Sequence, residues 1–393
     1  MKSYAHSTAA KLSSHWVLDP SVDYLNHGSF GACPAAVLET QARLRQEMER
    51  EPVDFLDGRL AARLDEARAA LAAFVGADAD DLVFVPNATT GVNAVLRSLR
   101  FEPGDELLVT DHTYGACRKC ADFVAERAGA RIVIARLPFP LQSEERILEA
   151  VLERVTGRTR LALIDHVTSP TALILPLARL VGGLRARGVE TLVDGAHAPG
   201  MVALELSRLG AAYYTGNAHK WLCAPKGAAF LHVRRDRQRG LHPTVISHGF
   251  RGGLRAEFDW TGTCDPTPWL CIPEALRVVG SLLPGGWPEV MARNHALAIE
   301  ARERLLEALE LEPPCPLGMV GAMASIPLPA PAPLSAAAGL DTKAMHDWFR
   351  ARGIETWLHP DPVPVLRISA QLYNSAGQFE RLAALLAECL RGR

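Results

Sequence analysis

Lysine is scarce in this sequence of 393 residues. It occupies six positions, so arginine supplies the other 36 of the 42 basic side chains. Arginine keeps its proton and cannot act as an amine nucleophile, so chemistry that needs a primary amine has few candidates. The lysines are Lys2, Lys11, Lys119, Lys220, Lys226 and Lys343.

The chain also lacks a strong charge of one sign and a long apolar run. Its net charge is −2, which gives no basic field that would attract nucleic acid or an anionic membrane. No stretch approaches 18 apolar residues, and residues 1–18 contain no apolar secretory core. Apolar and charged contents of 48% and 22% are ordinary for a soluble globular protein. Because the cysteines are scattered and no secretory core is present, we expect a cytoplasmic protein that does not span a membrane.

Several motifs of other protein classes are missing. The chain has no G-x-G-x-x-G, no G-x-x-x-x-G-K and no G-x-S-x-G, which argues against dinucleotide, P-loop and serine-hydrolase sites. Its eight cysteines are scattered and predict free thiols. Only Cys117 and Cys120 lie close together, one helical turn apart. No second pair accompanies them, so we predict no metal site.

Seven short apolar runs alternate with helical patterns between residues 80 and 235. Continuous apolar strands separated by helices are typical of a mainly parallel sheet that is buried on both faces. The sequence therefore predicts an α/β fold with a mainly parallel, seven-stranded sheet. The runs are 82–85, 106–110, 131–135, 160–165, 190–193, 211–215 and 228–233.

The remainder of the chain has a different character. An irregular segment rich in Gly, Pro, Thr and Trp spans 241–270, and a mixture of helical and strand patterns follows it. A chain of this length is typical of one large and one smaller domain. We expect a large domain over 22–269 and a small α+β domain over 270–393, with residues 1–21 packing against the small one.

Lys220 is the lysine whose surroundings suggest catalysis. It lies in a polar turn, Thr-Gly-Asn-Ala-His-Lys-Trp, 26 positions after Asp194, which ends an apolar run. Such a lysine can attach to the aldehyde of pyridoxal 5'-phosphate (PLP) and then act as an acid or base. Asp194 can keep the pyridine nitrogen protonated, which makes the ring an electron sink. The alternative for Lys220 is a surface position after a strand.

Polar motifs follow the other strands as well, where ligands of open α/β sheets gather. Ala88, Thr89 and Thr90 open a helix after the first strand and form a candidate phosphate cradle, or an ordinary helix cap. Tyr114 follows the second strand and can lie flat on the cofactor ring, whereas neighbouring His112 is assigned a structural role. Ordinary packing is the alternative for both side chains.

Five further residues are candidates for cofactor binding. Ser169 can contact the phenolic oxygen of PLP, although it also fits a plain turn at a strand end. His197 lies three residues after Asp194, and Asn217 and His219 flank the lysine and can reach the phosphate. Thr263 lies in a Gly/Thr turn and can offer a hydroxyl to the phosphate from a second subunit.

Arg367 lies inside the apolar run 365–369. A nearly buried guanidinium requires an anionic or strongly accepting partner. The α-carboxylate of a substrate would satisfy it, and so would a structural salt bridge.

These motifs together resemble the class V aminotransferase family of fold-type I PLP enzymes, and most closely its isopenicillin N epimerase-like branch. They keep the family's order along most of the chain. The segments are Leu25-Asn26-His27-Gly28-Ser29-Phe30-Gly31, Asn87-Ala88-Thr89-Thr90-Gly91, Asp111-His112-Thr113-Tyr114-Gly115, Asp194-Gly195-Ala196-His197, Thr215-Gly216-Asn217-Ala218-His219-Lys220-Trp221 and Trp260-Thr261-Gly262-Thr263.

The resemblance implies a PLP-transferase fold of type I and a homodimer with active sites at the subunit interface. It implies that Lys220 is the PLP-bearing lysine, that Asp194 contacts the ring nitrogen and that Tyr114 stacks on the ring. It also implies that Arg367, together with Asn26, binds the substrate carboxylate.

The reaction is left open between several possibilities. Cysteine desulfurases of the family have a nucleophilic cysteine on a loop before the arginine, but residues 353–360 contain none, and Cys315 is too far upstream. We therefore expect proton exchange at the α-carbon of an amino acid, or of a peptide bearing one, leading to epimerisation. C–S bond elimination and transamination are alternatives within the family. A catalytically silent PLP-fold binding protein and a nucleotide-binding α/β enzyme are alternatives from other classes.

Overall fold

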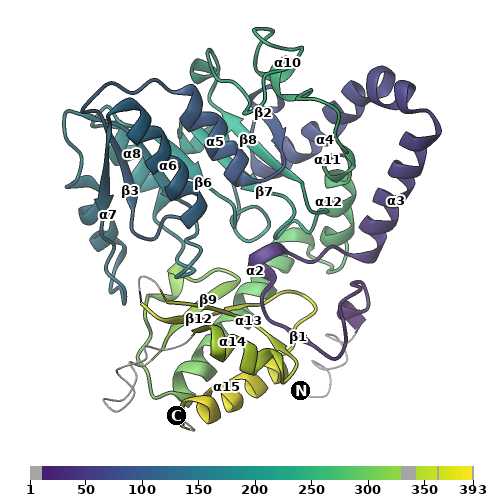
Figure 1. Cartoon of the computed structure of the whole chain (residues 1–393). Helices are drawn as coiled ribbons and strands as arrows, with labels where there is room; N and C mark the ends of the chain where they lie inside the picture. Colours follow the sequence, from purple (N-terminus) through teal and green to yellow (C-terminus); the bar gives the residue numbers. More distant parts are fainter. Residues whose placement is uncertain (1–10, 329–341, 361–362, 392–393) are drawn as a thin grey trace.

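The computed structural model describes residues 11–328, 342–360 and 363–391 (Figure 1). A central sheet with its helices forms the upper part of the molecule in this view. A smaller layer of strands and helices from the C-terminal part of the chain lies below it, next to the N-terminal segment. The active-site candidates lie where these two parts meet.

The central sheet has seven strands in the order β2-β8-β7-β6-β5-β3-β4. Strand β8 is antiparallel to both of its neighbours, and the remaining pairs are parallel, which confirms the prediction of a mainly parallel sheet. The strands are β2 (Leu82–Val85), β3 (Glu106–Thr110), β4 (Arg131–Ala135), β5 (Thr159–Asp165), β6 (Glu190–Asp194), β7 (Tyr213–Asn217) and β8 (Ala229–Val233).

Both faces of the sheet are buried. Successive side chains of a strand point to opposite faces, so Leu107 and Val109 pack in one apolar cluster and Leu108 packs in the other. This double burial explains why most of the strands have apolar residues at successive positions and not at alternate ones. The helices that follow these strands are α5 (Ala88–Ser98), α6 (Gly115–Ala128), α7 (Glu144–Leu152), α8 (Leu177–Arg185) and α9 (Leu206–Leu209).

Two long helices precede the sheet. Helix α3 (Ala35–Arg50) follows Pro34, and α4 (Leu60–Val75) buries Leu64 and Leu71 on its apolar stripe. Gly76 ends α4 in the left-handed conformation with φ of 64°, which glycine adopts at little cost. A short π-helix (Asp54–Arg59) leads into α4, and α2 (His27–Phe30) lies between the two parts of the molecule in Figure 1.

The segment 241–270 is largely irregular, as predicted, and contains α10 (Leu254–Phe258) and α11 (Thr267–Leu270). Helix α12 (Ile272–Gly280) packs on α3 and α4, whereas α13 (Gly286–Ala308) packs on α15 (Ala376–Arg391). The boundary at residue 270 therefore stays a prediction.

The C-terminal part is built on an antiparallel sheet in the order β11-β12-β9. Its strands are β9 (Met323–Pro327), β11 (Trp357–His359) and β12 (Val365–Ser369), and α14 (Thr342–Arg350) accompanies them. Strand β1 (Asp23–Tyr24) pairs with β10 (Ile354–Glu355), which fastens the N-terminal segment to this part. Leu12 and Trp16 pack in a cluster with Tyr373, whereas residues 1–10 of the expected N-terminal packing lie outside the described residues.

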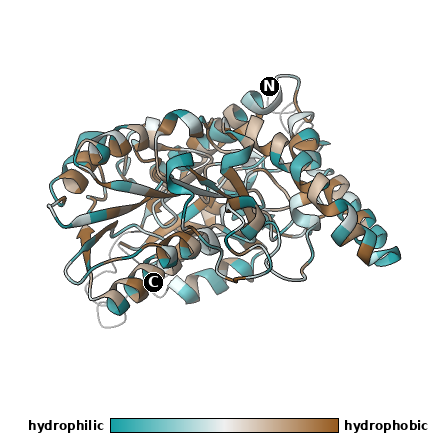
Figure 2. Cartoon of the chain, turned by 90° about the horizontal axis from the view of Figure 1, so that it is seen from above, coloured by the Kyte–Doolittle hydropathy of each residue, from teal (hydrophilic) through white to brown (hydrophobic). Residues whose placement is uncertain are grey.

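The stretch 353–360, which was compared with the cysteine-bearing loop of desulfurases, contains the two short strands β10 and β11. Trp357 lies opposite Arg367 in the pairing of β11 with β12, which no local pattern indicated. Figure 2 shows that the peripheral helices carry both hydrophilic and hydrophobic residues. None of the described helices is long and apolar enough to cross a membrane.

Candidate active site

A cavity of about 620 Å³ lies at the carboxyl ends of the parallel strands. Parallel strands end at the same edge of the sheet, so residues far apart in sequence meet there. The structure brings ten of the predicted residues together on the cavity wall. They are Ala88, Thr89, Thr90, Tyr114, Ser169, Asp194, His197, Asn217, His219 and Lys220.

Lys220 is held in the turn that follows β7. The backbone N–H and the ring of preceding His219 both bond to the carbonyl of Ala228, at 3.0 and 2.8 Å, which fixes the path of the turn. Lys220 Nζ lies 3.2 Å from His197 Nε2. Burial, reinforced by the positive charge of Arg367, lowers the pKa of Lys220 to about 7, although the Asp194 carboxylate opposes this shift. The amine is thus available as a nucleophile or base near neutral pH.

His197 is buried behind the lysine. Desolvation, followed by the positive charges of Lys220 and Arg367, lowers the pKa of His197 well below its ordinary value. The imidazole is therefore neutral. A neutral ring can accept a hydrogen bond from Lys220 without competing with it for charge.

Asp194 ends β6 and is almost completely buried. Its Oδ1 accepts the backbone N–H of Ala196 at 3.0 Å, and its Oδ2 accepts the thiol of Cys117 at 3.1 Å. Both donors stabilise the charged carboxylate. The structure therefore places a carboxyl group with two hydrogen-bond donors at the position where the sequence predicted a partner for a pyridinium nitrogen.

The N-terminus of α5 faces the cavity. Asn87 caps it by accepting the Thr90 N–H at 2.8 Å, and Asn217 Oδ1 accepts the Ala88 N–H at 2.8 Å. Asn217, expected at the phosphate, therefore joins the end of β7 to the start of α5. The positive end of the helix and the Thr89 side chain remain on the cavity wall, as an anion site requires.

Tyr114 and His112 have different surroundings. Tyr114 forms the N-cap of α6 and lines the cavity with 45% of its surface exposed. His112 is fully buried, and its Nδ1 lies 2.8 Å from the Thr171 hydroxyl. This agrees with the structural role that we assigned to His112, whereas Tyr114 remains the candidate for ring stacking.

Arg367 projects from β12 and is 1% exposed. Its Nη1 donates to the Ser169 carbonyl at 2.7 Å and to the Ser169 hydroxyl at 3.2 Å. Its Nη2 donates to Ser29 Oγ at 3.0 Å and to Asn26 Oδ1 at 3.4 Å. The ring of Trp357 lies 4.2 Å below the guanidinium carbon. In the part of the chain that the structure describes, no carboxylate forms an ion pair with Arg367, so these contacts do not support the structural salt bridge.

Some candidates lie outside this cavity. Thr263 is on an exposed turn and is absent from the cavity wall, so its proposed contact with a second subunit stays a prediction. His27 lies behind the lysine, with Nε2 3.0 Å from the Lys220 carbonyl and Nδ1 2.8 Å from the Tyr373 hydroxyl. Both ring nitrogens of His27 are therefore engaged away from the cavity wall.

The sequence interpretation missed several residues of the site. Ser29 and Phe30, from α2, line the cavity, and Cys117 supports Asp194. Asp165 also lines it and is the register partner of Asp194 on the neighbouring strand. A signal for Asp165 was present, because β5 and β6 both end in aspartate.

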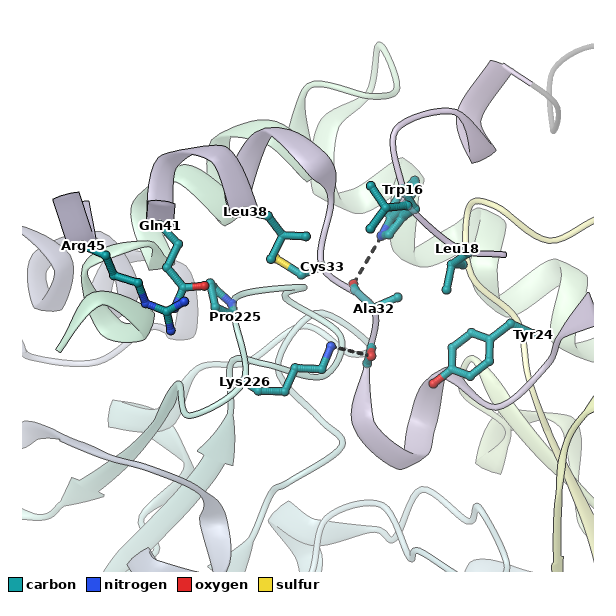
Figure 3. Close-up of a pocket in the computed structure, with 12 residues that line it drawn as sticks. Trp16, Leu18, Tyr24, Ala32, Cys33, Leu38, Gln41, Arg45, Pro225 and Lys226 are labelled. Carbon is teal, nitrogen blue, oxygen red and sulfur yellow. Dashed lines mark hydrogen bonds between the residues drawn. The ribbon is translucent and has the colours of Figure 1, made fainter. Parts of the chain in front are cut away.

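A second cavity, of about 350 Å³, lies near the N-terminal segment (Figure 3). Trp16, Tyr24, Cys33 and Lys226 are among the residues that line it. Lys226 Nζ donates to the Gly31 carbonyl at 2.9 Å, as Figure 3 shows. Lys226 is thus engaged away from the strand-end cluster, which leaves Lys220 as the lysine suited to catalysis.

Residues 33–308 match the family model described as "Aminotransferase class-V". The chain belongs to the aminotransferase class-V family. An isopenicillin N epimerase of Amycolatopsis lactamdurans is 38% identical, in an alignment that covers 94% of this chain and 96% of that protein. A probable chloroplastic L-cysteine desulfhydrase of Arabidopsis thaliana is 32% identical, with 93% and 82% covered.

Solved structures share the class V fold. A cystine C–S lyase in complex with cysteine persulfide superposes with a TM-score of 0.78 at 21% identity, covering 94% of this chain and 98% of that one. An apo cysteine desulfurase from Thermococcus onnurineus gives a TM-score of 0.81 at 18% identity, covering 98% of each chain. The fold is that of fold-type I PLP enzymes, as the motifs implied.

This class V protein is a PLP-dependent enzyme, and its cavity fits the cofactor. An amine with a lowered pKa, a hydrogen-bonded carboxylate and a helix N-terminus face the same space, and they match the aldehyde, ring nitrogen and phosphate of PLP. The assignment of each residue to its part of PLP remains a prediction.

Proposed function

We propose that this enzyme removes and returns the proton on the α-carbon of an amino acid, or of a peptide that bears one, and so epimerises it. The observation that best supports this function is the buried Arg367, which lacks a carboxylate partner among the described residues. Its guanidinium donates to Ser169 and Ser29, two residues that line the cavity of Lys220.

Arg367 would bind the substrate carboxylate. Burial lowers the pKa of Arg367 to about 9, because its described contacts are to neutral oxygens and to the face of Trp357. A carboxylate would give the guanidinium a charged, bidentate partner in a site with little water. Asn26 and Ser29 hold the guanidinium in place, so the bound α-carbon would have a defined orientation.

Lys220 would move the α-proton. With a pKa of about 7, its amine is close to half protonated at neutral pH, so it can both accept and return a proton. His197 Nε2, at 3.2 Å, restricts the position of Nζ. PLP, when bound, supplies an electron sink for the charge that forms at the α-carbon.

Tyr114 is the candidate for a second acid on the cavity wall. Epimerisation needs a proton donor on the face opposite the base, and the Tyr114 side chain is partly exposed to the cavity. Burial raises the pKa of Tyr114, so the phenol keeps its proton at neutral pH and can donate it. The 38% identity to an isopenicillin N epimerase adds support.

Elimination of a thiol from the β-carbon is the second candidate, because an L-cysteine desulfhydrase is among the relatives. It would begin with the same loss of the α-proton. None of the eight cysteines lines the main cavity, and this does not support a persulfide-forming nucleophile there.

The two candidates can be separated in one experiment. The holoenzyme would be incubated in deuterated water with a panel of amino acids and thiol amino acids. NMR would follow deuterium at the α-carbon, and sulfide would be assayed in parallel. Epimerisation predicts α-exchange and the opposite configuration in the recovered substrate. Rapid sulfide release, with no exchange on any other substrate, would exclude the epimerase proposal in favour of the lyase.

A further inference from the structure

Two aspartates lie side by side at the edge of the cavity. Asp165 ends β5 and Asp194 ends β6, and the pairing of these strands places the two residues in register. Both side chains are buried, at 2% and 3% exposure, and both line the cavity. Two ionised carboxylates at neighbouring positions would repel each other strongly in a site with little water.

The donors around the pair favour a charge on Asp194. Its two oxygens accept the Ala196 N–H and the Cys117 thiol, and the charge of nearby Lys220 interacts with it. Asp165 has a poorer set of partners. The Tyr114 backbone and the Thr113 hydroxyl lie beside it, but Asp165 Oδ2 is buried without a hydrogen-bond partner in the described structure.

An unpartnered buried carboxylate oxygen is costly, whereas a neutral carboxyl group in the same position can donate its proton to a neighbour. Burial, followed by the negative charge of Asp194, raises the pKa of Asp165 well above its ordinary value. His166, the next residue, contributes no compensating charge. Burial lowers the pKa of His166 to about 4, and its Nδ1 lies 2.9 Å from the Tyr214 hydroxyl.

We propose that Asp165 remains protonated in the working enzyme, so that the pair of aspartates carries one proton and one negative charge. The neutral Asp165 supplies a hydrogen-bond donor at the cavity wall and leaves Asp194 as the single anion of the pair. The further titratable groups that face the pair are Cys117, from α6, and Tyr114, from its N-cap. Burial raises the pKa of both, so they are neutral in the same pH range.

The inference rests on the proposed role of Asp194 at the ring nitrogen of PLP. An ionised Asp165 would add a second negative charge that attracts a bound pyridinium. A neutral Asp165 leaves Asp194 as the only carboxylate of the pair that attracts it. An Asp165→Asn substitution should then be mild, because an amide is also neutral and can donate a hydrogen bond.

The protonation state can be measured directly by infrared difference spectroscopy of the full-length holoenzyme. We expect a carbonyl band of a protonated carboxyl group at pH 8, shifted in deuterated water and absent from Asp165→Asn. Asp105→Asn is a matched control that should leave the band unchanged. The carboxyl group of buried Asp105 accepts the Glu102 N–H and the Arg160 guanidinium, both at 2.8 Å, and these contacts lower its pKa. The proposal would be overturned if the wild type lacked the band. It would also be overturned if Asp194→Asn lost the band and Asp165→Asn kept it.

The affinity for PLP separates this proposal from the role of Asp194. We expect Asp165→Asn to keep the PLP dissociation constant within about twofold, and Asp194→Asn to raise it by about tenfold or more, because only the latter removes a charge. Equal, large losses in both variants would show that Asp165 is ionised and would refute the inference. A normal affinity in Asp194→Asn, with the Asp165 band intact, would instead refute the ring-nitrogen role. If Asp165→Asn does not fold, the pH dependence of the wild-type carboxyl band still tests the proposal. A protonated Asp165 keeps this band from pH 6 to 9, whereas an Asp165 that ionises in this range would lose it.

Discussion

At the scale of single residues, the site is built by burying groups that are ordinarily charged. Asp165 and Arg367 are almost fully removed from water and Lys220 is partly buried, and each has fewer charged partners than such burial normally requires. Such groups lower the stability of the folded protein, but they bind ligands strongly because their charges lack partners. Stability measurements should therefore detect these residues without any knowledge of the substrate.

Lys220→Met should stabilise the PLP-free protein in a pH-dependent way. The unfolded chain keeps the lysine proton up to about pH 10.5, whereas the folded state loses it above about pH 7. Between these values the unfolded state binds more protons, so wild-type stability rises with pH. The loss of folding stability caused by burying the charged Lys220 amine is complete below pH 7 and vanishes above pH 10.5. We expect the variant to gain on the order of 3 kcal/mol at pH 7 and progressively less toward pH 10.

Urea unfolding at several pH values would check this difference. Lys343→Met is the control, because its side chain is 86% exposed and should show no comparable pH-dependent gain. A constant difference between Lys220→Met and the wild type across the range would contradict the lowered pKa.

Arg367→Lys should weaken recognition of the substrate carboxylate more than it affects turnover. Lysine keeps the positive charge but loses the planar fork and its packing on the Trp357 ring. We expect KM for an amino acid substrate to rise by about tenfold or more, with a smaller change in kcat. The affinity for the corresponding decarboxylated amine should be nearly unchanged. An equal loss for amino acid and amine would indicate that Arg367 has only a structural role.

At the scale of secondary structure elements, the phosphate end of the site depends on how closely α5 approaches β7. Gly91 makes this approach possible, since a Cβ atom there would lie 2.3 Å from Thr215 Oγ1. Asn217, at the end of β7, then accepts the first N–H of α5. The helix N-terminus is thereby held at the cavity by a side chain from a strand far away in sequence.

Asn217→Ala and Asn217→Asp should separate the capping role from phosphate binding. Alanine removes the acceptor and should lower the free energy of unfolding by about 1 kcal/mol. Aspartate keeps an acceptor and should preserve stability, but its charge would repel a phosphate and weaken PLP binding. Denaturation of the PLP-free variants and PLP titration would measure the two effects. Tight PLP binding by Asn217→Asp would place the phosphate elsewhere.

At the scale of the whole molecule, the site joins the central sheet to the C-terminal part. Arg367 reaches from β12 to Ser169, which follows β5, and to Ser29 of α2. We further propose that the enzyme is a homodimer in which Thr263 reaches the cofactor site of the partner. Thr263 lies on an exposed turn outside its own chain's cavity, which is consistent with this arrangement.

Mixed dimers provide the test of this assembly. Lys220→Met and Thr263→Arg chains should each form inactive dimers. If Thr263 acts across the interface, a mixed dimer retains one site with a wild-type Lys220 and a wild-type Thr263. Co-refolding the two variants should therefore restore up to half of the activity per site. No recovery in a dimer of confirmed mixed composition, or a fully active monomer, would contradict the proposal.

Local sequence patterns were enough to determine the central sheet and most of the cavity wall. Strands β2, β3, β5 and β8 are largely apolar because both of their faces are buried, and polar residues follow the strand ends because a parallel sheet exposes those ends at one edge. Lys220 and Asp194 could be recognised for this reason. The scarcity of lysine reduced the number of alternatives further.

Only the tertiary structure decided which groups share a charge, a proton or a hydrogen bond. The pairing of β5 with β6 places Asp165 beside Asp194, and the packing of α6 directs Cys117 toward Asp194. Strand β11 places the Trp357 ring under the Arg367 guanidinium, which no local pattern predicted. These relations depend on strand order and packing between distant segments. A sequence pattern can indicate whether a residue is buried, but it does not indicate which distant residues contact it in the fold.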